Sequence, residues 1–419
     1  MISALFSIFF LTSSFQQKQK TKTSNAITVV DQQARERIDA TLKSFVDSGK
    51  VVGVSALVFE KNKEVYYNAF GYANREEKMK MDRNTIVRLY SMTKPIAGVA
   101  LMTLYEKGAF KLDDPLAKYA PEFANMKVYK GVDASGKMLL EPAKRAITIR
   151  DLTRHTAGFV ATTDLPGLGE LAKKTDPLNP NNTLAEMAKK LATLPLLFQP
   201  GDQWAYGPSV DVQAYLVERL SGKPFDNYLQ EVIFGPLGMN NTRYVVPEND
   251  RKRFAGMYRK TDDGRLTLVP DEENTFNIKN YPLTPGGFGL TSTLDDYMKF
   301  ARMLVNKGQF GTARILKPET VKLMATNQLS DTIRQRMWLP SKGQVGFGID
   351  FAVRLRKPAS KQENNGEVGE FFWDGAASTL FWVDPVNELT AVLFVQEMPF
   401  YGKLHKSFRD AVYGAYKAD

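Results

Sequence analysis

Ser91 and Lys94 are the first pair of residues whose types and spacing could carry covalent chemistry. Ser91 is the only serine in the chain that is followed by lysine three positions later. Residues three apart share one face of a helix, so the lysine amine can reach the serine hydroxyl. A serine hydroxyl becomes a good nucleophile when a base takes its proton, and a lysine withdrawn from water can be that base. Pro95 is tolerated only in a first helical turn, which predicts that a helix begins near Ser91.

Tyr206 is the second candidate, in the sequence Trp-Ala-Tyr-Gly-Pro-Ser at residues 204–209. A tyrosine in a Gly/Pro turn before a helix could project its hydroxyl into a cleft. A nearby ammonium group would lower the pKa of the phenol and make it a proton shuttle. The alternative interpretation is a loop tyrosine that only packs its ring.

The third candidate is the sequence Phe-Trp-Asp-Gly-Ala-Ala-Ser at residues 372–378, between two predicted strands. Gly375 and Ala376 would let the backbone approach a ligand closely and direct an N–H group at it. The alternative is a tight hairpin turn in which Trp373 only fills the core.

The elements that must position these residues can be read from periodicity and turn signals. The pattern predicts helices at 31–48, 91–106, 182–194, 210–220 and 404–416, and strands at 51–59, 64–73, 345–353, 368–373, 378–383 and 389–396. Consecutive strands with short turns predict an antiparallel sheet, covered by helices from both ends of the chain. The fold class is therefore α+β.

Composition limits the chemistry that this chain can use. It has 419 residues, no cysteine and only two histidines, which excludes disulfides, thiolate nucleophiles and a histidine-rich metal centre. We therefore expect no metal and no cofactor, and a catalytic base other than histidine. The net charge of +10 is spread without a long basic block, so nucleic acid is not an expected partner.

Other enzyme signatures are missing from the sequence. It contains no Gly-x-Ser-x-Gly, no Walker-type phosphate loop and no dinucleotide fingerprint. His155 could serve a Ser-His-Asp triad, but a structural role in capping a turn is the favoured interpretation. His405, in the last helix, is expected at the surface.

Residues 1–11 are uncharged and almost entirely apolar, which is typical of the central region of a signal peptide. Cleavage after Ser14 or after Ala26 would export the protein to the periplasm or the medium, although the usual preceding basic residue is absent. A misassigned start of the chain is the alternative. No later stretch is long and apolar enough to span a membrane.

The three candidates, in this order and spacing, resemble the serine β-lactamase and penicillin-binding-protein superfamily, and more closely its class C-related carboxylesterases. The resemblance runs from about residue 27 to 418 and includes further stretches at 112–115, 147–152, 234–239 and 286–290. It implies a sheet domain at 27–111 and 283–419, with a mainly helical domain inserted at 112–282. The signal peptide and linker predicted from the apolar start occupy residues 1–26. The resemblance also implies that Ser91 is acylated, that Lys94 and Tyr206 exchange its proton, and that the amides of Ser91 and Ala376 hold the oxyanion.

Two departures from the superfamily bear on the substrate. Its lactamases and peptidases carry asparagine two residues after the tyrosine, where this chain has Pro208. They begin their third motif with lysine or histidine, where Trp373, Asp374 and Gly375 stand here as the expected substrate-binding residues. An aromatic residue followed by an acid disfavours an anionic ligand at that position.

We therefore expect a serine hydrolase that acts on small ester substrates, by hydrolysis or acyl transfer. A β-lactamase or a peptidase specific for D-amino acids, acting on an amide, is the alternative within enzymes. A non-catalytic binding or sensor module on the same fold is the alternative from another class. The sequence does not predict the oligomeric state.

Overall fold

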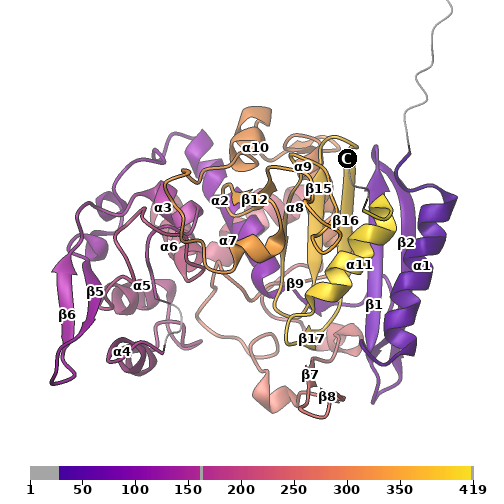
Figure 1. Ribbon diagram of the computed structural model, residues 1–419, viewed down its shortest axis with the longest axis horizontal. Helices are drawn as coiled ribbons and strands as arrows, with labels where there is room; N and C mark the ends of the chain where they lie inside the picture. Colours follow the sequence, from indigo (N-terminus) through magenta and orange to yellow (C-terminus); the bar gives the residue numbers. More distant parts are fainter. Residues whose placement is uncertain (1–27, 161–163, 417–419) are drawn as a thin grey trace, which may run out of the picture.

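A single eight-stranded antiparallel sheet is the centre of the computed structural model, which describes residues 28–160 and 164–416 (Figure 1). The strand order is β12-β13-β14-β15-β16-β1-β2-β3, so strands from the two ends of the sequence meet where β1 pairs with β16. The strands are β1 (Gly53–Glu60), β2 (Lys63–Asn74), β3 (Met79–Lys80), β12 (Val345–Phe347), β13 (Ala352–Arg354), β14 (Phe371–Asp374), β15 (Leu380–Asp384) and β16 (Leu389–Phe394).

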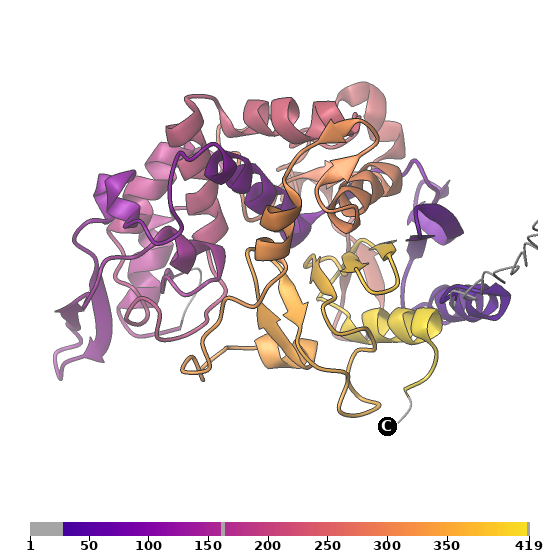
Figure 2. The ribbon, with the colours of Figure 1, turned by 90° about the horizontal axis from the view of Figure 1, so that it is seen from above.

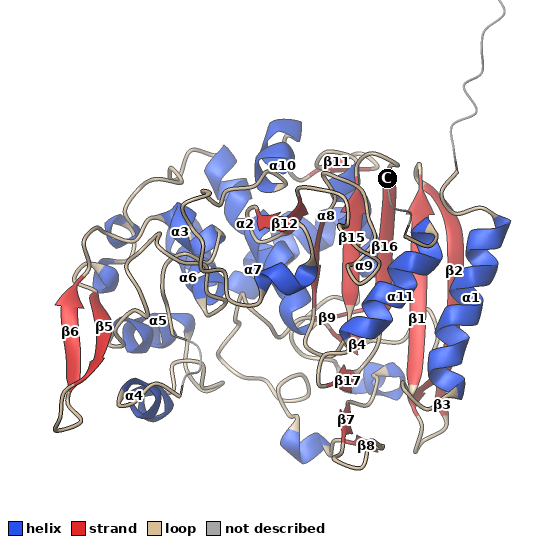
Figure 3. Cartoon of the chain, in the orientation of Figure 1, coloured by secondary structure: helices blue, strands red, loops and turns tan. Residues whose placement is uncertain are grey.

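Helices cover both faces of the sheet, which explains why its central strands β15 and β16 are buried along their whole length and mostly apolar (Figure 3). Phe381 points from β15 to one face, where its ring lies 5.0 Å from that of Tyr297 in α9 (Leu294–Val305). The next residue, Trp382, points to the other face and packs against Phe408 of α11 (Gly402–Tyr413) at 5.3 Å. Helix α1 (Gln32–Asp47) lies beside α11, where Arg37 donates a hydrogen bond to the Ala411 carbonyl.

The remaining helices and small sheets lie mainly between the two halves of the large sheet in sequence. The helices are α2 (Thr93–Glu106), α3 (Ile149–Thr153), α4 (Leu168–Thr175), α5 (Leu184–Ala192), α6 (Ser209–Ser221), α7 (Phe225–Leu229), α8 (Gly235–Leu237) and α10 (Pro318–Met324). The small strand pairs and triplets are β4 (Val87–Arg88) with β9 (Thr291–Ser292), β5 (Lys127–Val132) with β6 (Met138–Pro142), β7 (Tyr258–Lys260) with β8 (Leu266–Leu268) and β17 (Glu397–Met398), and β10 (Gln309–Phe310) with β11 (Ala313–Arg314).

The α+β prediction is confirmed, and the structure adds features that the sequence pattern did not predict. The expected strand at 345–353 is two strands, β12 and β13, with a turn that contains Asp350 at a φ of 58°. The β5–β6 hairpin was also not predicted, and Figure 2 shows it at the opposite end of the molecule from α1. Within the described ranges no helix is long and apolar enough to cross a membrane. The predicted signal peptide lies outside those ranges.

Glu397 is a carboxylic acid buried where β17 meets the start of β1, and its side chain accepts a hydrogen bond from the Val52 amide. Burial raises the pKa of the Glu397 carboxyl from 4.5 to about 8. Between these values an unfolded chain has released a proton that the folded chain retains, so this group makes the protein less stable as the pH rises.

Glu397→Gln is expected to remove that part of the pH dependence, because glutamine stays neutral and keeps the acceptor oxygen. The melting temperature of the variant relative to wild type should rise between about pH 5 and about pH 8. Thermal unfolding followed by circular dichroism measures this, with the exposed Glu272→Gln as the matched control. Parallel curves for wild type and Glu397→Gln would contradict the prediction.

Candidate active site

Ser91 lies in a short 3₁₀ turn, Tyr90–Met92, that leads directly into α2. The preceding residue, Tyr90, has a φ of 48°, a left-handed conformation that costs energy for a residue with a Cβ. This turn presents Ser91 to a cavity, whereas Lys94 and Pro95 fall in the first turn of α2, as predicted.

Lys94 is buried, with only 5% of its surface exposed, and its side-chain nitrogen contacts two oxygens. Its Nζ lies 3.3 Å from Ser91 Oγ and donates a hydrogen bond of 2.6 Å to the carbonyl of Gly287. The amide of Gly287 in turn donates to Asp211 Oδ1 at 2.9 Å. Asp211 therefore fixes the peptide segment that holds the lysine beside the serine.

Two buried carboxyl groups surround Lys94, and sequence reasoning identified neither. Burial raises the pKa of Asp211, and the Lys94 charge partly opposes that rise. The same two causes act on Asp350, whose pKa lies well above its ordinary value. Asp350 Oδ1 accepts a hydrogen bond from Gln213, whereas its Oδ2 is buried without a partner in the described residues. The Lys94 side chain is thus held in a polar but buried environment with little access to solvent.

Tyr206 lies over the same ammonium group, with the Lys94 Nζ 4.5 Å from the centre of its ring. Its ring is held by Trp338 at 5.1 Å and Trp373 at 5.6 Å, between ring centres. The alternative interpretation, a loop tyrosine that packs its ring, is therefore correct as far as the packing is concerned. The ring also lines the cavity that Ser91 lines, so the two residues do converge.

Of the two histidines, His155 has the structural role predicted for it, whereas His405 is not at the surface as expected. The ring of His155 is buried against Tyr206, with centres 5.0 Å apart, and neither ring nitrogen has a hydrogen-bond partner in the described residues. The ring therefore packs in the core, while the backbone of His155, at a φ of 57° and with its amide bonded to the Leu152 carbonyl, caps the end of α3 as predicted. Burial, and then the charge of Lys94, lower the pKa of His155 well below 6.5. His405 is buried, not at the surface, and its Nε2 lies at hydrogen-bond distance, 2.8 Å, from the Ser378 carbonyl oxygen.

The active-site cavity has a volume of about 400 Å³, and its lining comes from distant parts of the sequence. It is lined by Ser91, Tyr206, Trp338, Ser341, Lys342, Trp373, Asp374, Ala376 and Phe400. The turn between β14 and β15 therefore brings Ala376 to Ser91, as expected for an oxyanion site. The Ala376 amide donates to no acceptor in the described part of the chain, so it is free to bind a ligand oxygen.

Gly375 has a different position from the one predicted. It is not among the lining residues, and a Cβ at this position would stand 2.4 Å from the Leu89 carbonyl oxygen. Its lack of a side chain lets the β14–β15 turn pack against the segment that precedes Ser91. Trp373 and Asp374 do line the cavity, although Trp373 is only 1% exposed.

Lys342, from the 3₁₀ turn Leu339–Lys342, forms a buried ion pair with Asp374. The lysine also lies 4.4 Å from the centre of the Phe400 ring. This pairing corrects the expectation that Asp374 disfavours an anionic ligand, because its negative charge is already compensated. No spacing signal links residues 342 and 374, and the sequence reasoning missed Lys342.

Among the described residues, no group of three or more His, Asp or Glu side chains is placed so that it could hold a metal ion.

The chain matches the Beta-lactamase family over residues 38–412 and belongs to that family. Protein Rv1367c of Mycobacterium tuberculosis is 34% identical over 367 residues, which cover 86% of this chain and 89% of the relative. Lovastatin esterase of Penicillium rubens is 27% identical over 409 residues, which cover 91% of this chain and 99% of the relative. The structure of EstCE1, a hydrolase with promiscuous acyltransferase activity, superimposes with a TM-score of 0.74 at 27% identity, covering 92% and 100% of the two chains. The homologues thus include esterases and a hydrolase that transfers acyl groups.

Proposed function

We propose that the protein is a serine hydrolase that cleaves carboxylic esters through an acyl-Ser91 intermediate. One observation carries this proposal: a buried lysine amine lies 3.3 Å from a serine hydroxyl, at a cavity that also holds Tyr206 and the Ala376 amide. A nucleophile, a proton acceptor and an oxyanion donor are the parts that acyl transfer requires.

In the first half of the reaction, Ser91 Oγ attacks the ester carbonyl carbon while Lys94 or Tyr206 takes the hydroxyl proton. The carbonyl oxygen becomes an oxyanion, which the amides of Ser91 and Ala376 stabilise. Collapse of this intermediate breaks the bond to the alcohol oxygen, which receives the proton. The acyl group is then bonded to Ser91 and the alcohol leaves.

In the second half, a water molecule attacks the acyl-Ser91 carbonyl carbon and gives one proton to the same groups. The bond between that carbon and Ser91 Oγ then breaks, and Oγ takes the proton back. The products are the carboxylic acid and the free enzyme. An alcohol can take the place of the water, in which case the product is a new ester. The names of the homologues support both outcomes, and the cavity is large enough for a small organic acceptor.

The lining of the cavity favours esters over β-lactams. Pro208 supplies no side-chain amide at the position where lactamases of this superfamily have asparagine. Four aromatic residues, Tyr206, Trp338, Trp373 and Phe400, give the cavity an apolar wall that suits an acyl chain. The apolar start of the chain remains the basis for proposing export.

A substrate panel tests the proposal. We expect p-nitrophenyl butyrate to be turned over with a kcat/KM at least about 10²-fold above that for nitrocefin or a D-Ala-D-Ala peptide, because each lost polar contact reduces transition-state binding. Release of p-nitrophenol, absorbance of opened nitrocefin and chromatography of the peptide measure the three rates.

Comparable rates on nitrocefin or the peptide would favour the lactamase or peptidase alternative. Tight ligand binding without turnover of any of the three would favour the sensor module.

A further inference from the structure

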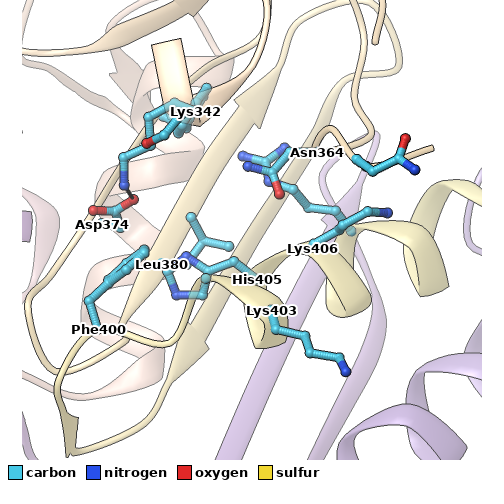
Figure 4. Close-up of a pocket in the computed structure, with 13 residues that line it drawn as sticks. Lys342, Asn364, Asp374, Leu380, Phe400, Lys403, His405 and Lys406 are labelled. Atoms are coloured by element: carbon cyan, nitrogen blue, oxygen red, sulfur yellow. Dashed lines mark hydrogen bonds and ion pairs between the residues drawn. The ribbon is translucent and has the colours of Figure 1, made fainter. Parts of the chain in front are cut away.

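A second cavity, of about 300 Å³, adjoins the active-site cavity and has no part in the reaction proposed above. Ser341, Lys342, Asp374 and Phe400 line both cavities, so the two are neighbours that meet at the Lys342–Asp374 pair. Figure 4 shows that pair on one side of the second cavity, with Asn364 and Lys406 on the other. The second cavity is therefore the space next to the one in which a substrate at Ser91 would lie.

The walls of this second cavity carry an excess of positive charge. Four of its lining residues are cations, Lys342, Lys403, Lys406 and Arg409, whereas Asp374 is its only acidic lining residue. Lys342 is paired with Asp374, and Lys406 is paired with Asp410 on the same helix. Lys403 is exposed and has no ion pair among the described residues.

The floor of the cavity adds a buried charge. Arg409 is 1% exposed, lies with its guanidinium 4.7 Å from the centre of the Phe372 ring, and donates to Glu370 at 2.7 Å. Glu370 also accepts from Arg354, so one buried carboxylate serves two buried guanidinium groups. Such an excess charge acts strongly over short distances because water screens it poorly.

Arg409 also has a donor without a partner. Its Nη2 is buried and has no acceptor in the described residues, which is costly for a charged group. Arg409 lines the cavity, and the side-chain amides of Gln362 and Asn364 border the same space. An anion bound there would meet the lysines and amides directly and would offset the charge of the floor.

We propose that this second cavity, the basic subsite, binds a carboxylate or phosphate group that an ester substrate carries at a distance from its ester bond. The inference rests on the proposed function, because it places the scissile ester at Ser91. It assigns Lys403 and Lys406 as direct contacts to the anion. The substrate class is therefore an ester with an anionic tail rather than a simple neutral ester.

The test compares esters that differ only at the tail. p-Nitrophenyl hemiesters of succinate, adipate and suberate place a carboxylate at increasing distance on the acyl side, and butyrate esters of ω-hydroxy acids place it on the alcohol side. Their methyl-capped forms are the neutral references, and phosphate-tipped versions distinguish the two anions. We expect kcat/KM for at least one anionic ester to exceed that of its neutral reference about tenfold, the effect of a charge-assisted hydrogen bond.

Three results support the subsite together. The anionic-to-neutral ratio should fall severalfold in Lys403→Gln and in a Lys403→Gln, Lys406→Gln double variant, and it should fall as salt is raised. Lys137→Gln, in the distant β5–β6 hairpin, removes the same charge and should leave the ratio unchanged. A ratio is used because a general loss of stability would lower both rates alike.

Binding to Ser91→Ala separates this inference from the proposed function. Calorimetry of the intact variant should give tighter binding of the anionic ester than of its neutral reference, whether or not wild type turns esters over. Turnover of neutral esters without any preference for anionic ones, on either side of the ester, would overturn the subsite alone. Equal binding of both forms to Ser91→Ala would also overturn it.

Discussion

Ser91→Ala is expected to lose ester turnover by a factor on the order of 10⁶ in kcat, because no other group at the cavity can replace the missing nucleophile. Ser341, the other serine in the cavity lining, has no lysine amine at hydrogen-bond distance among the described contacts. The decisive measurement is intact-protein mass after brief exposure to p-nitrophenyl butyrate and an acid quench. Wild type should gain the mass of one butyryl group, which peptide mapping should place on Ser91.

The matched control is Ser135→Ala, in the exposed turn between β5 and β6. It should acylate and turn over as wild type does, and both variants should keep the wild-type melting temperature closely. An adduct that persists in Ser91→Ala, or a map that places it elsewhere, would refute the assignment of the nucleophile.

Lys94→Met is expected to show two effects, one on activity and one on stability. Loss of the base should lower kcat/KM about 10³- to 10⁴-fold. The pKa values of Asp211 and Asp350, which burial raises and the Lys94 charge lowers, should rise further without the ammonium group. The unfolded chain ionises both carboxyls alike in the two proteins, so the variant should lose stability relative to wild type as the pH rises above the ordinary range of these groups and through their raised folded-state pKa values. Thermal unfolding across this range measures the trend.

Lys94→Arg separates the two effects. A guanidinium group still compensates the two carboxylates, but it does not act as a base at these pH values. It should therefore restore most of the stability at high pH without restoring activity. The proposed role of Lys94 would fail if Lys94→Arg hydrolysed esters at the wild-type rate, or if Lys94→Met lost no more stability at high pH than at low pH.

The local parts of the fold and site could be predicted because their causes are local. The contact of Ser91 with Lys94 follows from helical spacing, and the start of α2 follows from Pro95. The strands β15 and β16 follow from apolar runs between turns. The convergence of Tyr206 and Ala376 on Ser91 depended on the family resemblance, since no local rule joins residues so distant in sequence.

The charged groups buried around the site could not be predicted, because Asp and Lys are usually found at the surface. Asp350 lies in a turn within the mostly apolar segment 345–353, which the sequence pattern predicted as a single strand. Asp211 lies in the first turn of α6. Lys342 is buried where it pairs with Asp374 of β14, a contact between distant parts of the sequence. His405 was expected at the surface, because the sequence does not show that α11 packs against the turn at Ser378.

The pairing of β1 with β16 has a consequence for how the chain folds while it is being synthesised. β1 ends at Glu60 and its partner begins at Leu389, so a ribosome synthesises most of the chain before the middle of the sheet can close. Until then β1 offers an unsatisfied, apolar edge to any other extended polypeptide, the kind of exposure that chaperones protect. Chains released early, before Leu389, would lack this partner and would be prone to aggregate rather than to form a smaller working enzyme.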